Sequence, residues 1–502
     1  MVWILLLIAA DGWAERVNRL TIMHFNDIYE INPQRERGGF APLMTLIERH
    51  RHRHADTLLT FGGDLLSPSV YSYLTRGKEM ITLCNTLGVD VAVLGNHEFD
   101  FGLETLQQRL QGSRFPWLAA NVRTADGDLL PHTRQWHIQQ IGDLSVAFIG
   151  LLTPFTAELA NLGQQVTFLD PIEVARQQVA ALQQQGVDLI IALTHLTLAE
   201  DEALARQVAG IDLILGGHDH DGTLHTVGTT QIIKASSDGG QLAVVELTLL
   251  RPDADSQGKP RLFTDLHWLS TFRVPAHPPV QAMADAIEQR MSSRMQTVVA
   301  TTAMELDSRE STVRAKESSL GNLFADAMRH AHKSDVSLLN GGSLRGNRLY
   351  AAGSPLTYGD IVKESPFGNT VVLLEISAEH LWQALEHGVA HYGKGAGRFL
   401  QIAGFSFRFN PQLPPGERVQ EVWLRQGEQN VALQRQGTRR IKVATNDYLA
   451  RGGDGFHMLK EGQVLVSAEA GKPLSTVVMD YLQQHESAPT MPVGQRILLG
   501  GP

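Results

Sequence analysis

Between Leu20 and Leu250 the sequence alternates short apolar runs, rich in β-branched residues, with amphipathic stretches. Almost every position in the runs is apolar, which is typical of strands buried on both faces. The runs are residues 20–25, 57–61, 89–94, 144–152, 187–194, 211–215 and 242–250. The stretches 41–50 and 170–185 between them have helical patterns. Strands that alternate with helices predict an α/β domain with a layered sheet.

The pattern changes after this region. Residues 251–280 are polar and rich in proline, which indicates a domain boundary. A helix is expected near 279–296, and a second α/β segment follows it to the end of the chain. A length of 502 residues is consistent with two or three domains.

Composition excludes several classes of function. Lys and Arg total 43 and Asp and Glu total 53, so the net charge is −10. An acidic chain lacks the basic footprint needed to bind a nucleic-acid polymer. Cys84 is the only cysteine, so neither an intrachain disulfide nor a cysteine-based zinc site is expected. Any metal chemistry must therefore use His, Asp and Asn.

The first residues predict an export signal. Residues 2–10 are apolar, and the small residues Gly12 and Ala14 follow near a possible cleavage point. The alternative is a buried first strand. No run reaches the ~18–20 apolar residues that span a bilayer, so we expect no membrane span. These features favour a periplasmic or secreted protein, whereas the oligomeric state is not predicted.

Polar clusters follow five of the predicted strands. Ligands of open α/β sheets gather beyond the carboxyl ends of the strands, so we expect these clusters to converge. The clusters are Asn26-Asp27, Gly62-Gly63-Asp64, Asn96-His97 with Asp100, Thr194-His195 and Gly217-His218-Asp219-His220. Oxygen and imidazole donors without thiolates suit zinc, manganese, cobalt or iron better than calcium. The donors suffice for two ions joined by a carboxylate, at the ~3.5–4 Å spacing used in phosphoester hydrolysis.

At these residues the chain resembles the calcineurin-like metallophosphatases, and more specifically the 5′-nucleotidase family with its periplasmic UDP-sugar hydrolases. The resemblance covers nearly all of residues 20–500. It rests on the motifs HFND, FGGDLLSPS, LGNHEFDFG, THL, GGHDH, ESSLGNLFADAM, NGGSLRG, PFGN and NDYLARGGDGF.

The resemblance implies a β-sandwich flanked by helices, followed by a C-terminal α+β domain that binds the substrate. The expected divisions are 1–14 as signal peptide, 19–255 as metallophosphatase domain, 256–297 as linker and connecting helix, and 298–500 as nucleotide-binding domain.

The resemblance also implies roles for the strand-end residues. Two divalent ions, of unspecified identity, are the expected cofactors. One is held by Asp27 and His220, and Asp64 joins it to the other. Asn96, His195 and His218 hold the second ion, and His97 with Asp100 forms the catalytic pair.

Tyr29 departs from the family pattern, which usually has histidine at this position. Two divalent ions bring four positive charges, of which Asp27, Asp64 and a hydroxide cancel three. A Tyr29 phenolate would cancel the fourth and weaken attraction for a phosphate. We therefore expect Tyr29 to fill space beside a more open first metal, with ligation by the phenolate as the alternative.

The second half contains features of a substrate site. Asn340 begins a Gly-rich turn that ends in Arg345, an arrangement that lets backbone N–H groups and a guanidinium approach an anion. From local sequence alone it is also compatible with a tight turn and a surface arginine. Phe367 and Tyr448 lie at turns and are equally compatible with a base-stacking role or the core.

The family resemblance assigns these residues to a nucleotide, which is the expected small-molecule partner. Phe367 and Tyr448 would clamp the base, and Asp454 would accept hydrogen bonds from the ribose. The residues expected at the phosphate or ribose are Arg314, Asn340 and Arg345.

These observations predict a secreted two-metal phosphoesterase that hydrolyses 5′-nucleotides to nucleosides and phosphate. Alternatives on the same scaffold are a UDP-sugar diphosphatase, a 2′,3′-cyclic-nucleotide phosphodiesterase or a thiosulfohydrolase. Because Tyr29 replaces the histidine that is usual in the family, an alternative of another class is a nucleotide-binding protein with an inactive centre. The presence of Asn96, His97 and Asp100 argues against that class.

Overall fold

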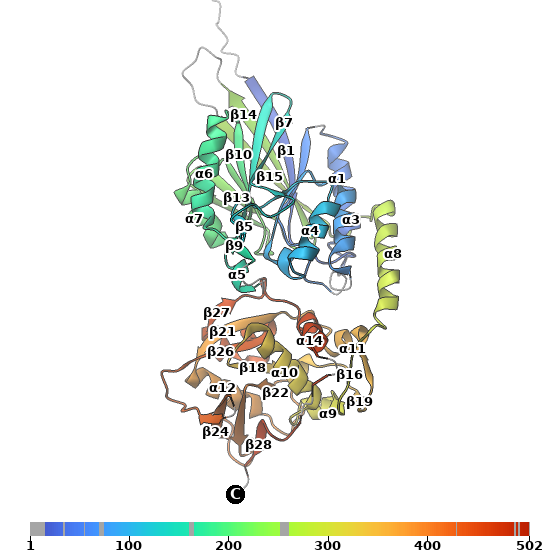
Figure 1. Ribbon diagram of the computed structural model, residues 1–502, viewed down its shortest axis with the longest axis vertical. Helices are drawn as coiled ribbons and strands as arrows, with labels where there is room; N and C mark the ends of the chain where they lie inside the picture. The colour runs from blue at the N-terminus through green and yellow to red at the C-terminus, as the bar shows by residue number, and fades with distance from the viewer. Residues whose placement is uncertain are drawn as a thin grey trace, which may run out of the picture. The chain divides into compact units, whose positions relative to one another are not determined.

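The structure is a computed structural model that divides into two compact units. Of the described residues, those up to Ser67 and from Thr75 to Ala286 form unit 1, whereas Pro68, Ser69 and those from Ile287 onward form unit 2. It describes residues 16–33, 36–54, 56–69, 75–159, 165–251, 261–427, 429–485, 488–489 and 492–500. The predicted signal peptide, 1–14, lies outside these residues. Figure 1 shows the ribbon, and each unit is described by itself below.

Unit 1 is built on two sheets. The first has the strand order β15 (Arg261–Ser270), β14 (Gln241–Arg251), β1 (Arg16–Phe25), β2 (Thr57–Phe61), β3 (Val91–Val93), β4 (Trp117–Leu118) and β6 (Thr133–Arg134). The second has the order β12 (Thr223–Val227), β13 (Thr230–Lys234), β11 (Leu213–Gly216), β10 (Leu189–His195), β8 (Leu144–Leu152) and β7 (Trp136–Ile141). β5 (Val122–Thr124) and β9 (Val166–Phe168) form a separate pair. β1, β2 and β3 are parallel, as are β8, β10, β11 and β13.

The two sheets face each other across a shared core. Alternate residues of one strand point to opposite faces, so Ile191 of β10 packs with Ile22 of β1 and Val93 of β3 between the sheets. Ile190 instead faces outward and packs with Val179 on a helix. Burial on both faces explains why the strands are continuously apolar.

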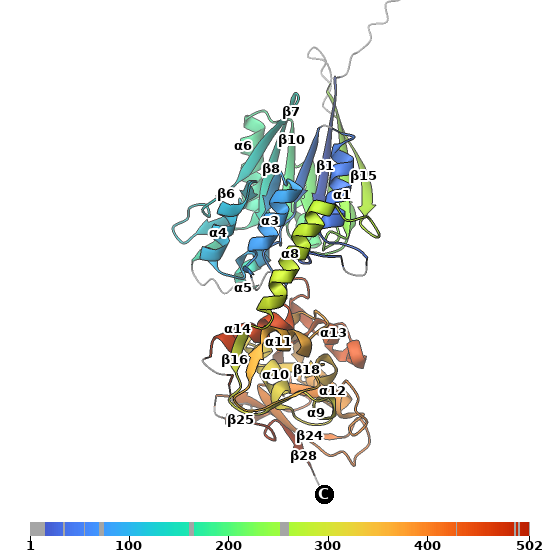
Figure 2. The same ribbon diagram turned by 90° about the vertical axis from the view of Figure 1, so that its right-hand side faces the viewer.

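Helices cover the outer faces of this sandwich. Figures 1 and 2 show α6 on the side of the β7–β8–β10 sheet and α1 on the side of β1. The helices are α1 (Phe40–Arg51), α3 (Lys78–Leu87), α4 (Leu103–Gly112), α5 (Thr156–Leu159), α6 (Pro171–Gln184) and α7 (Leu198–Gln207). α6 begins after Asp170, whose carboxylate accepts hydrogen bonds from two backbone N–H groups of the first turn. The predicted helices 41–50 and 170–185 are thus confirmed.

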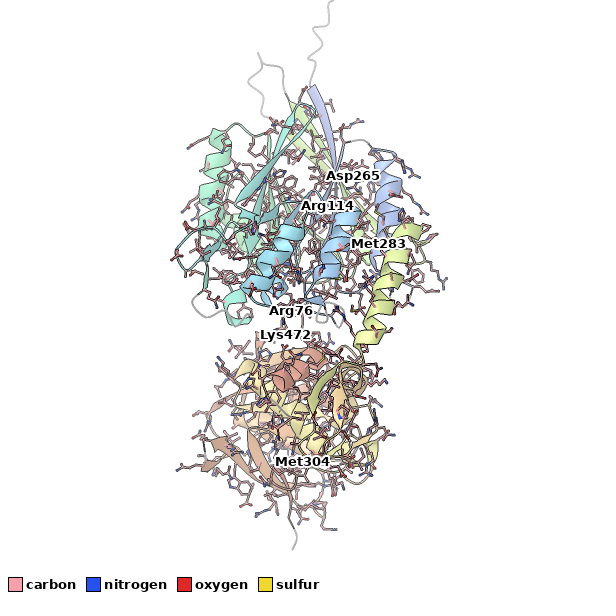
Figure 3. The ribbon with its side chains drawn as sticks, turned by 45° about the vertical axis from the view of Figure 1, so that its right-hand side comes forward. Arg76, Arg114, Asp265, Met283, Met304 and Lys472 are labelled. Atoms are coloured by element: carbon pink, nitrogen blue, oxygen red, sulfur yellow. The ribbon has the colours of Figure 1, made fainter. Side chains whose placement is uncertain are left out.

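The region after β14 contains regular structure that the sequence pattern does not indicate. Residues 261–270, which fall in the predicted linker, form β15 and pair antiparallel with β14. α8 (Pro278–Arg294) follows, as expected for 279–296. Met283, which Figure 3 labels on α8, accepts a hydrogen bond at Sδ from the hydroxyl of Thr86 on α3, at 3.8 Å.

Unit 2 contains a five-stranded and a four-stranded sheet. The first has the order β22 (Leu400–Ala403), β18 (Val336–Asn340), β26 (Arg440–Asn446), β21 (Val371–Ser377) and β27 (Gln463–Val466). The second has the order β25 (Gln429–Ala432), β24 (Val419–Gln426), β23 (Phe405–Phe409) and β28 (Ile497–Leu499). Two further pairs join β16 (Val298–Thr301) with β20 (Pro355–Thr357) and β17 (Leu306–Asp307) with β19 (Leu349–Tyr350).

The helices of unit 2 are α9 (Glu310–Val313), α10 (Ser319–His332), α11 (Tyr358–Glu364), α12 (Ala378–Val389), α13 (Asp447–Ala450) and α14 (Leu474–Gln483). α10 is an amphipathic helix that contains most of the ESSLGNLFADAM motif. Its Leu320, Leu323 and Phe324 are fully buried, and Ser318 caps its first turn. The predicted fold class is confirmed for both units. Among the described residues, no helix is long and apolar enough to cross a bilayer.

Candidate metal centre and substrate-binding residues

The strand ends of unit 1 bring the predicted metal ligands together, as the sequence analysis expects. β1 leads into Asp27, β2 into Asp64, and β3 into the short helical turn Asn96–Phe99. In the second sheet, β10 ends at His195 and β11 leads into His218. Each of these residues is less than 5% exposed. The buried donors therefore come from both sheets.

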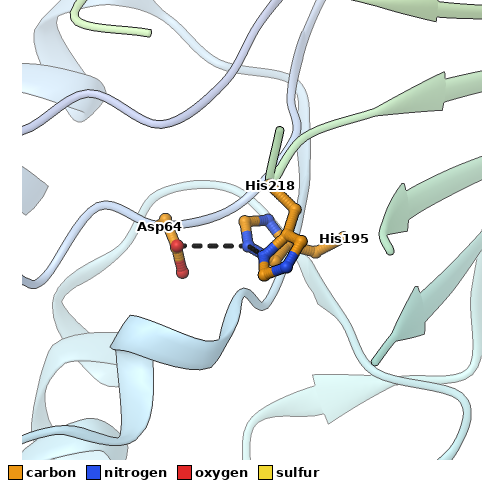
Figure 4. Close-up of side chains that lie close together, drawn as sticks. All are labelled: Asp64, His195 and His218. Carbon is orange, nitrogen blue, oxygen red and sulfur yellow. Dashed lines mark hydrogen bonds and ion pairs between the residues drawn. The ribbon is translucent and has the colours of Figure 1, made fainter. Parts of the chain in front are cut away.

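Four donor atoms, which we call the second donor group, lie around one point. They are Asp64 Oδ2, Asn96 Oδ1, His195 Nε2 and His218 Nδ1. His195 Nε2 lies 3.1 Å from Asp64 Oδ2, 3.2 Å from Asn96 Oδ1 and 3.3 Å from His218 Nδ1. His218 Nδ1 lies 3.1 Å from Asn96 Oδ1. Figure 4 shows both imidazoles turned toward Asp64, with the His195–Asp64 contact dashed.

The first donor group comprises Asp27 Oδ1, His220 Nε2 and Asp64 Oδ2. His220 Nε2 lies 3.4 Å from Asp27 Oδ1. The hydroxyl of Tyr29 lies among all three, at 3.0 Å from Asp27 Oδ1, 2.9 Å from His220 Nε2 and 3.3 Å from Asp64 Oδ2. The same Asp64 oxygen therefore contacts His195 in the second group and the Tyr29 hydroxyl beside the first group.

Backbone contacts orient these donors for a cation. His195 Nδ1 donates to the carbonyl of Gly62 at 2.8 Å, so Nε2 is the ring nitrogen that faces the other donors. Asp27 Oδ2 accepts from the backbone N–H of His218 at 2.9 Å, so Oδ1 faces the first group. Gly63 adopts φ 90°, and a Cβ there would lie 2.7 Å from His195 Nδ1. The oxygen and imidazole donors thus fit divalent transition-metal ions.

The electrostatics of the cluster favour positive charge. Burial opposes protonation of His195, but the charges of Asp64 and Asp27 outweigh it and raise the pKa of His195 to about 10. Burial and the nearby His195 lower the pKa of His218 well below its usual value. One cation among these donors is therefore stable without a metal, and metal ions would replace that proton.

His97 and Asp100 form a hydrogen-bonded pair beside the donors. His97 Nδ1 donates to Asp100 Oδ2 at 2.9 Å, and the two side chains are 1% and 5% exposed. The backbone N–H of His97 donates to Asp64 Oδ1 at 2.9 Å, so the same turn positions the pair and the shared carboxylate. The imidazole lies edge-on to the Tyr29 ring, with centroids 6.3 Å apart.

In unit 2 the structure brings together Asn340, Tyr448 and Asp454. Asn340 Nδ2 donates to Asp454 Oδ2 at 2.9 Å, and the Tyr448 hydroxyl donates to Asp454 Oδ1 at 3.0 Å. Phe367 and Tyr448 are 56% and 41% exposed, so neither is a core residue. The guanidinium of Arg345 lies over the Phe367 ring, 5.0 Å from its centroid.

Arg314 lies in a neighbouring segment and pairs with Glu310 at 2.8 Å. The residue before it, Val313, holds its carbonyl against Gly341, where a Cβ would lie 2.1 Å from that oxygen. The arginine is therefore on the chain segment that packs against the Gly-rich turn after Asn340. Among the described residues, no hydrogen bond or ion pair joins Arg314 to the other predicted substrate residues.

Comparisons with known proteins identify the family. The model of the calcineurin-like phosphoesterase family matches residues 20–222, and that of the 5′-nucleotidase C-terminal domain matches residues 298–461. A snake venom 5′-nucleotidase of Naja atra is 30% identical, over 93% of this chain and 96% of that protein. The chain belongs to the 5′-nucleotidase family.

Solved structures agree with this assignment. A 5′-nucleotidase precursor from Thermus thermophilus is 29% identical, covers 96% of this chain and 99% of its own, and has a TM-score of 0.56. The NAD nucleotidase of Haemophilus influenzae shares the fold, with a TM-score of 0.82 at 20% identity over 97% of this chain and 100% of its own. This member of the 5′-nucleotidase family is a metal-dependent phosphoester hydrolase, as the sequence predicts.

Sequence reasoning missed Glu98, although it lies inside the GNHEFD motif. Its fully buried carboxylate accepts from four backbone N–H groups, those of Asp64, Leu65, Leu66 and Gly95, at 2.9, 2.6, 3.1 and 2.5 Å. Burial and the charge of Asp64 raise the pKa of Glu98 to about 7. Glu98 thus holds the loop that carries the shared carboxylate of this 5′-nucleotidase family member.

Lys234 was also missed, since it stands at the end of a strand like many solvent-exposed lysines. It is fully buried, and its ammonium lies 2.8 Å from Asp201 and 2.5 Å from Asp219. The ammonium also donates to the carbonyls of Leu196 and Gly217, at 2.6 and 2.9 Å. Leu196 and Gly217 are the sequence neighbours of His195 and His218. The Lys234 ammonium therefore binds both loops that carry these predicted ligands.

Proposed function

We propose that this protein uses two divalent metal ions to hydrolyse 5′-nucleotides to nucleosides and phosphate. The observation that carries the proposal is the position of Asp64 Oδ2, which belongs to both donor groups. An oxygen shared by two sets of donors supports two ions held at the short spacing used in phosphoester hydrolysis.

The donor groups support an assignment of ligands. Asp27 and His220 would hold the first ion, Asp64 would join the two, and the second would be held by Asn96, His195 and His218. When bound, the ions supply Lewis acidity and an activated water. Zinc, manganese, cobalt and iron all suit this set of donors.

His97 is placed to act in the chemistry. Its Nδ1 donates to Asp100, so we assign the catalytic role to Nε2. We propose that Nε2 stabilises the charge that develops on the phosphoryl group and assists the departing alkoxide. Asp100 fixes the tautomer and the ring orientation, as a carboxylate paired with a histidine does.

Unit 2 carries the proposed nucleoside-binding residues. Two exposed aromatic rings, those of Phe367 and Tyr448, would stack on the base at about 1–3 kcal/mol per stack. Asp454 is held at both oxygens by neutral donors and would accept from the ribose hydroxyls. Arg345, with Asn340 and Arg314, would contact the phosphate or ribose.

The protein is proposed to act outside the cytoplasm, in the periplasm or after secretion. The apolar run 2–10 and the small residues Gly12 and Ala14 after it support this placement. The similarity to a 5′-nucleotidase named as a venom protein is consistent with it.

A substrate panel tests the proposed function. Metal-loaded protein is assayed with AMP, UDP-glucose, cyclic AMP and bis-p-nitrophenyl phosphate, with Mn²⁺ added. We expect the highest kcat/KM with AMP. Preference for UDP-glucose or for a diester would replace the nucleotidase proposal by one of the related hydrolases, and binding of AMP without turnover would identify a nucleotide-binding protein.

A further inference from the structure

We propose that the phenolic oxygen of Tyr29 is a ligand of the first metal ion. The inference rests on the two-metal function proposed above and concerns the identity of one protein donor. From the sequence, charge counting favours a space-filling role for this ring. The contacts of its hydroxyl favour ligation instead.

The hydroxyl lies where a ligand would lie. It is 2.9 Å from His220 Nε2, 3.0 Å from Asp27 Oδ1 and 3.3 Å from Asp64 Oδ2. Donors that share one ion at about 2.1 Å are about 3.0–3.4 Å apart in octahedral or tetrahedral geometry.

The second donor group supplies an internal reference. The contacts among its four atoms, given above, are 3.1–3.3 Å long. With Tyr29 included, the first group also has four atoms, and their recorded separations are 2.9–3.4 Å. The two groups then have the same number of donors and the same spacing around Asp64 Oδ2.

Hydrogen bonding alone does not explain the contacts of this hydroxyl. A phenol has one proton to donate, yet two carboxylate oxygens lie within 3.3 Å of it. Even if His220 donates to the phenol, one carboxylate oxygen faces a lone pair. A cation at the centre of the group turns every one of these contacts into attraction.

The backbone fixes Tyr29 in this position. Its N–H donates to Asp238 Oδ1 at 3.0 Å, and the N–H of Glu30 donates to the same oxygen at 3.2 Å. The N–H of Asp238 in turn donates to the carbonyl of Asp27 at 2.7 Å. The turn that carries the first ligand and the phenol is therefore held as one piece.

Ligation makes the two metal positions chemically different. The first would be surrounded by three anionic oxygens, from Asp27, Asp64 and Tyr29, and one imidazole. The second has one shared carboxylate, an amide oxygen and two imidazoles. On ligation, the phenolic proton would pass to solvent.

The test compares wild type with Tyr29→Phe and Tyr29→His. Metal-free protein is titrated with Zn²⁺ or Mn²⁺, or loaded with iron in air, and metal content is measured after dialysis. We expect a tyrosinate difference band in the ultraviolet on binding of the divalent ions. Iron should add a visible phenolate-to-metal charge-transfer band. Both bands should be absent from the two Tyr29 variants.

Metal retention provides a second readout. Tyr29→Phe should bind the first ion at least about tenfold more weakly, whereas Tyr29→His, which restores a donor, should retain it without either band. Tyr481→Phe is the control, because Tyr481 on α14 of unit 2 lies against His330 and His485. It should keep both bands, and circular dichroism of the metal-free variants checks folding.

The outcomes separate this inference from the proposed function. Wild-type protein that holds two ions and hydrolyses AMP without any Tyr29-dependent band overturns the ligand assignment and leaves the function intact. Wild-type protein that holds fewer than two ions, or does not hydrolyse AMP, counts against the two-metal nucleotidase itself.

Discussion

The candidate metal centre of unit 1 and the proposed nucleoside site of unit 2 are built in opposite ways. Asp27, Asp64 and His195 are fully buried. Hydrogen bonds to backbone groups orient the side chains of Asp27 and His195. Phe367 and Tyr448 expose about half of their surface. Charged donors in a buried site need fixed partners before any ligand arrives, because unpaired buried charge is costly. A stacking platform must instead stay open to the base that covers it.

Removing the metals should have the largest effect, because it disables the metal site of unit 1 and leaves the nucleoside site of unit 2 in place. Chelation should abolish hydrolysis of AMP and of p-nitrophenyl phosphate alike, because both need the metal centre, and Mn²⁺, Co²⁺ or Zn²⁺ should restore it. AMP binding by unit 2 should weaken far less, as measured by calorimetry. Full activity after exhaustive chelation, with metal analysis confirming removal, would refute the metal requirement.

His97→Ala should separate chemistry from metal binding. We expect kcat to fall by about 10²–10⁴-fold, the range for acid–base and charge-stabilising groups. Metal content should stay near wild type, because the imidazole is paired with Asp100 and belongs to neither donor group. His225→Ala, which removes a half-exposed histidine that pairs with Glu202, is the control and should change little. Loss of metal from the His97 variant would make this residue a ligand.

Lys234→Met tests how far the rigidity of the centre depends on one buried charge. The substitution leaves Asp201 and Asp219 without their cation, and breaking such a buried pair costs about 3–5 kcal/mol. We expect a lower Tm and weaker metal retention. Arg206→Met is the control, because its pair with Glu202 is exposed and worth about 0–1 kcal/mol. Equal effects of the two variants would mean that Lys234 does not hold the ligand loops.

Phe367→Ala or Tyr448→Ala should affect only the open site. Loss of a stack worth about 1–3 kcal/mol should raise KM for AMP by roughly tenfold or more. Hydrolysis of p-nitrophenyl phosphate, which has no base to stack, should remain near wild type. Phe272→Ala, at an exposed phenylalanine of unit 1, is the control. Equal losses of activity on AMP and on p-nitrophenyl phosphate would mean that the two aromatic residues stabilise the fold and do not bind the base.

The smallest effect concerns Glu98 and pH. Its pKa in the metal-free fold is raised from 4.5 to about 7, by burial and by Asp64, so the native state holds the proton more tightly than the unfolded chain. The resulting stabilisation is present below about pH 4.5 and is lost as the pH rises through 7. Thermal unfolding of metal-free wild type should therefore lose a few degrees of Tm over this range relative to Glu98→Gln. Parallel pH profiles would show that Glu98 stays charged.

Much of the fold could be predicted from the apolar runs. The runs 57–61 and 144–152 coincide with β2 and β8, because a strand buried on both faces is apolar at nearly every position. β15 could not be predicted in this way. Its residues 261–270 alternate between exposed and half-buried at the edge of a sheet, and pairing with β14 stabilises the strand. Edge strands carry a weaker sequence signal for that reason.

The residues of the candidate site also divide into those that the sequence predicts and those that it does not. The convergence of Asp27, Asp64 and His195 follows from the order of the strands in the chain and from their parallel direction. It could therefore be expected from the sequence alone. The roles of Glu98 and Lys234 could not, because both depend on which backbone groups are left unpaired in the folded loops. In unit 2, the motif identifies Phe367 and Tyr448, and only their exposure separates a platform from a core position.

The sequence by itself determined the family, the two-part fold, and the types of donor available to a metal. These follow from local patterns and from residue chemistry, which are present in any conformation of the chain. Only the tertiary structure decided that Asp64 presents one oxygen to both donor groups and that the Tyr29 hydroxyl lies among Asp27, Asp64 and His220. Such positions depend on contacts between residues up to about 190 apart in sequence. Local patterns do not specify contacts of that range, because packing of the two sheets against each other sets them.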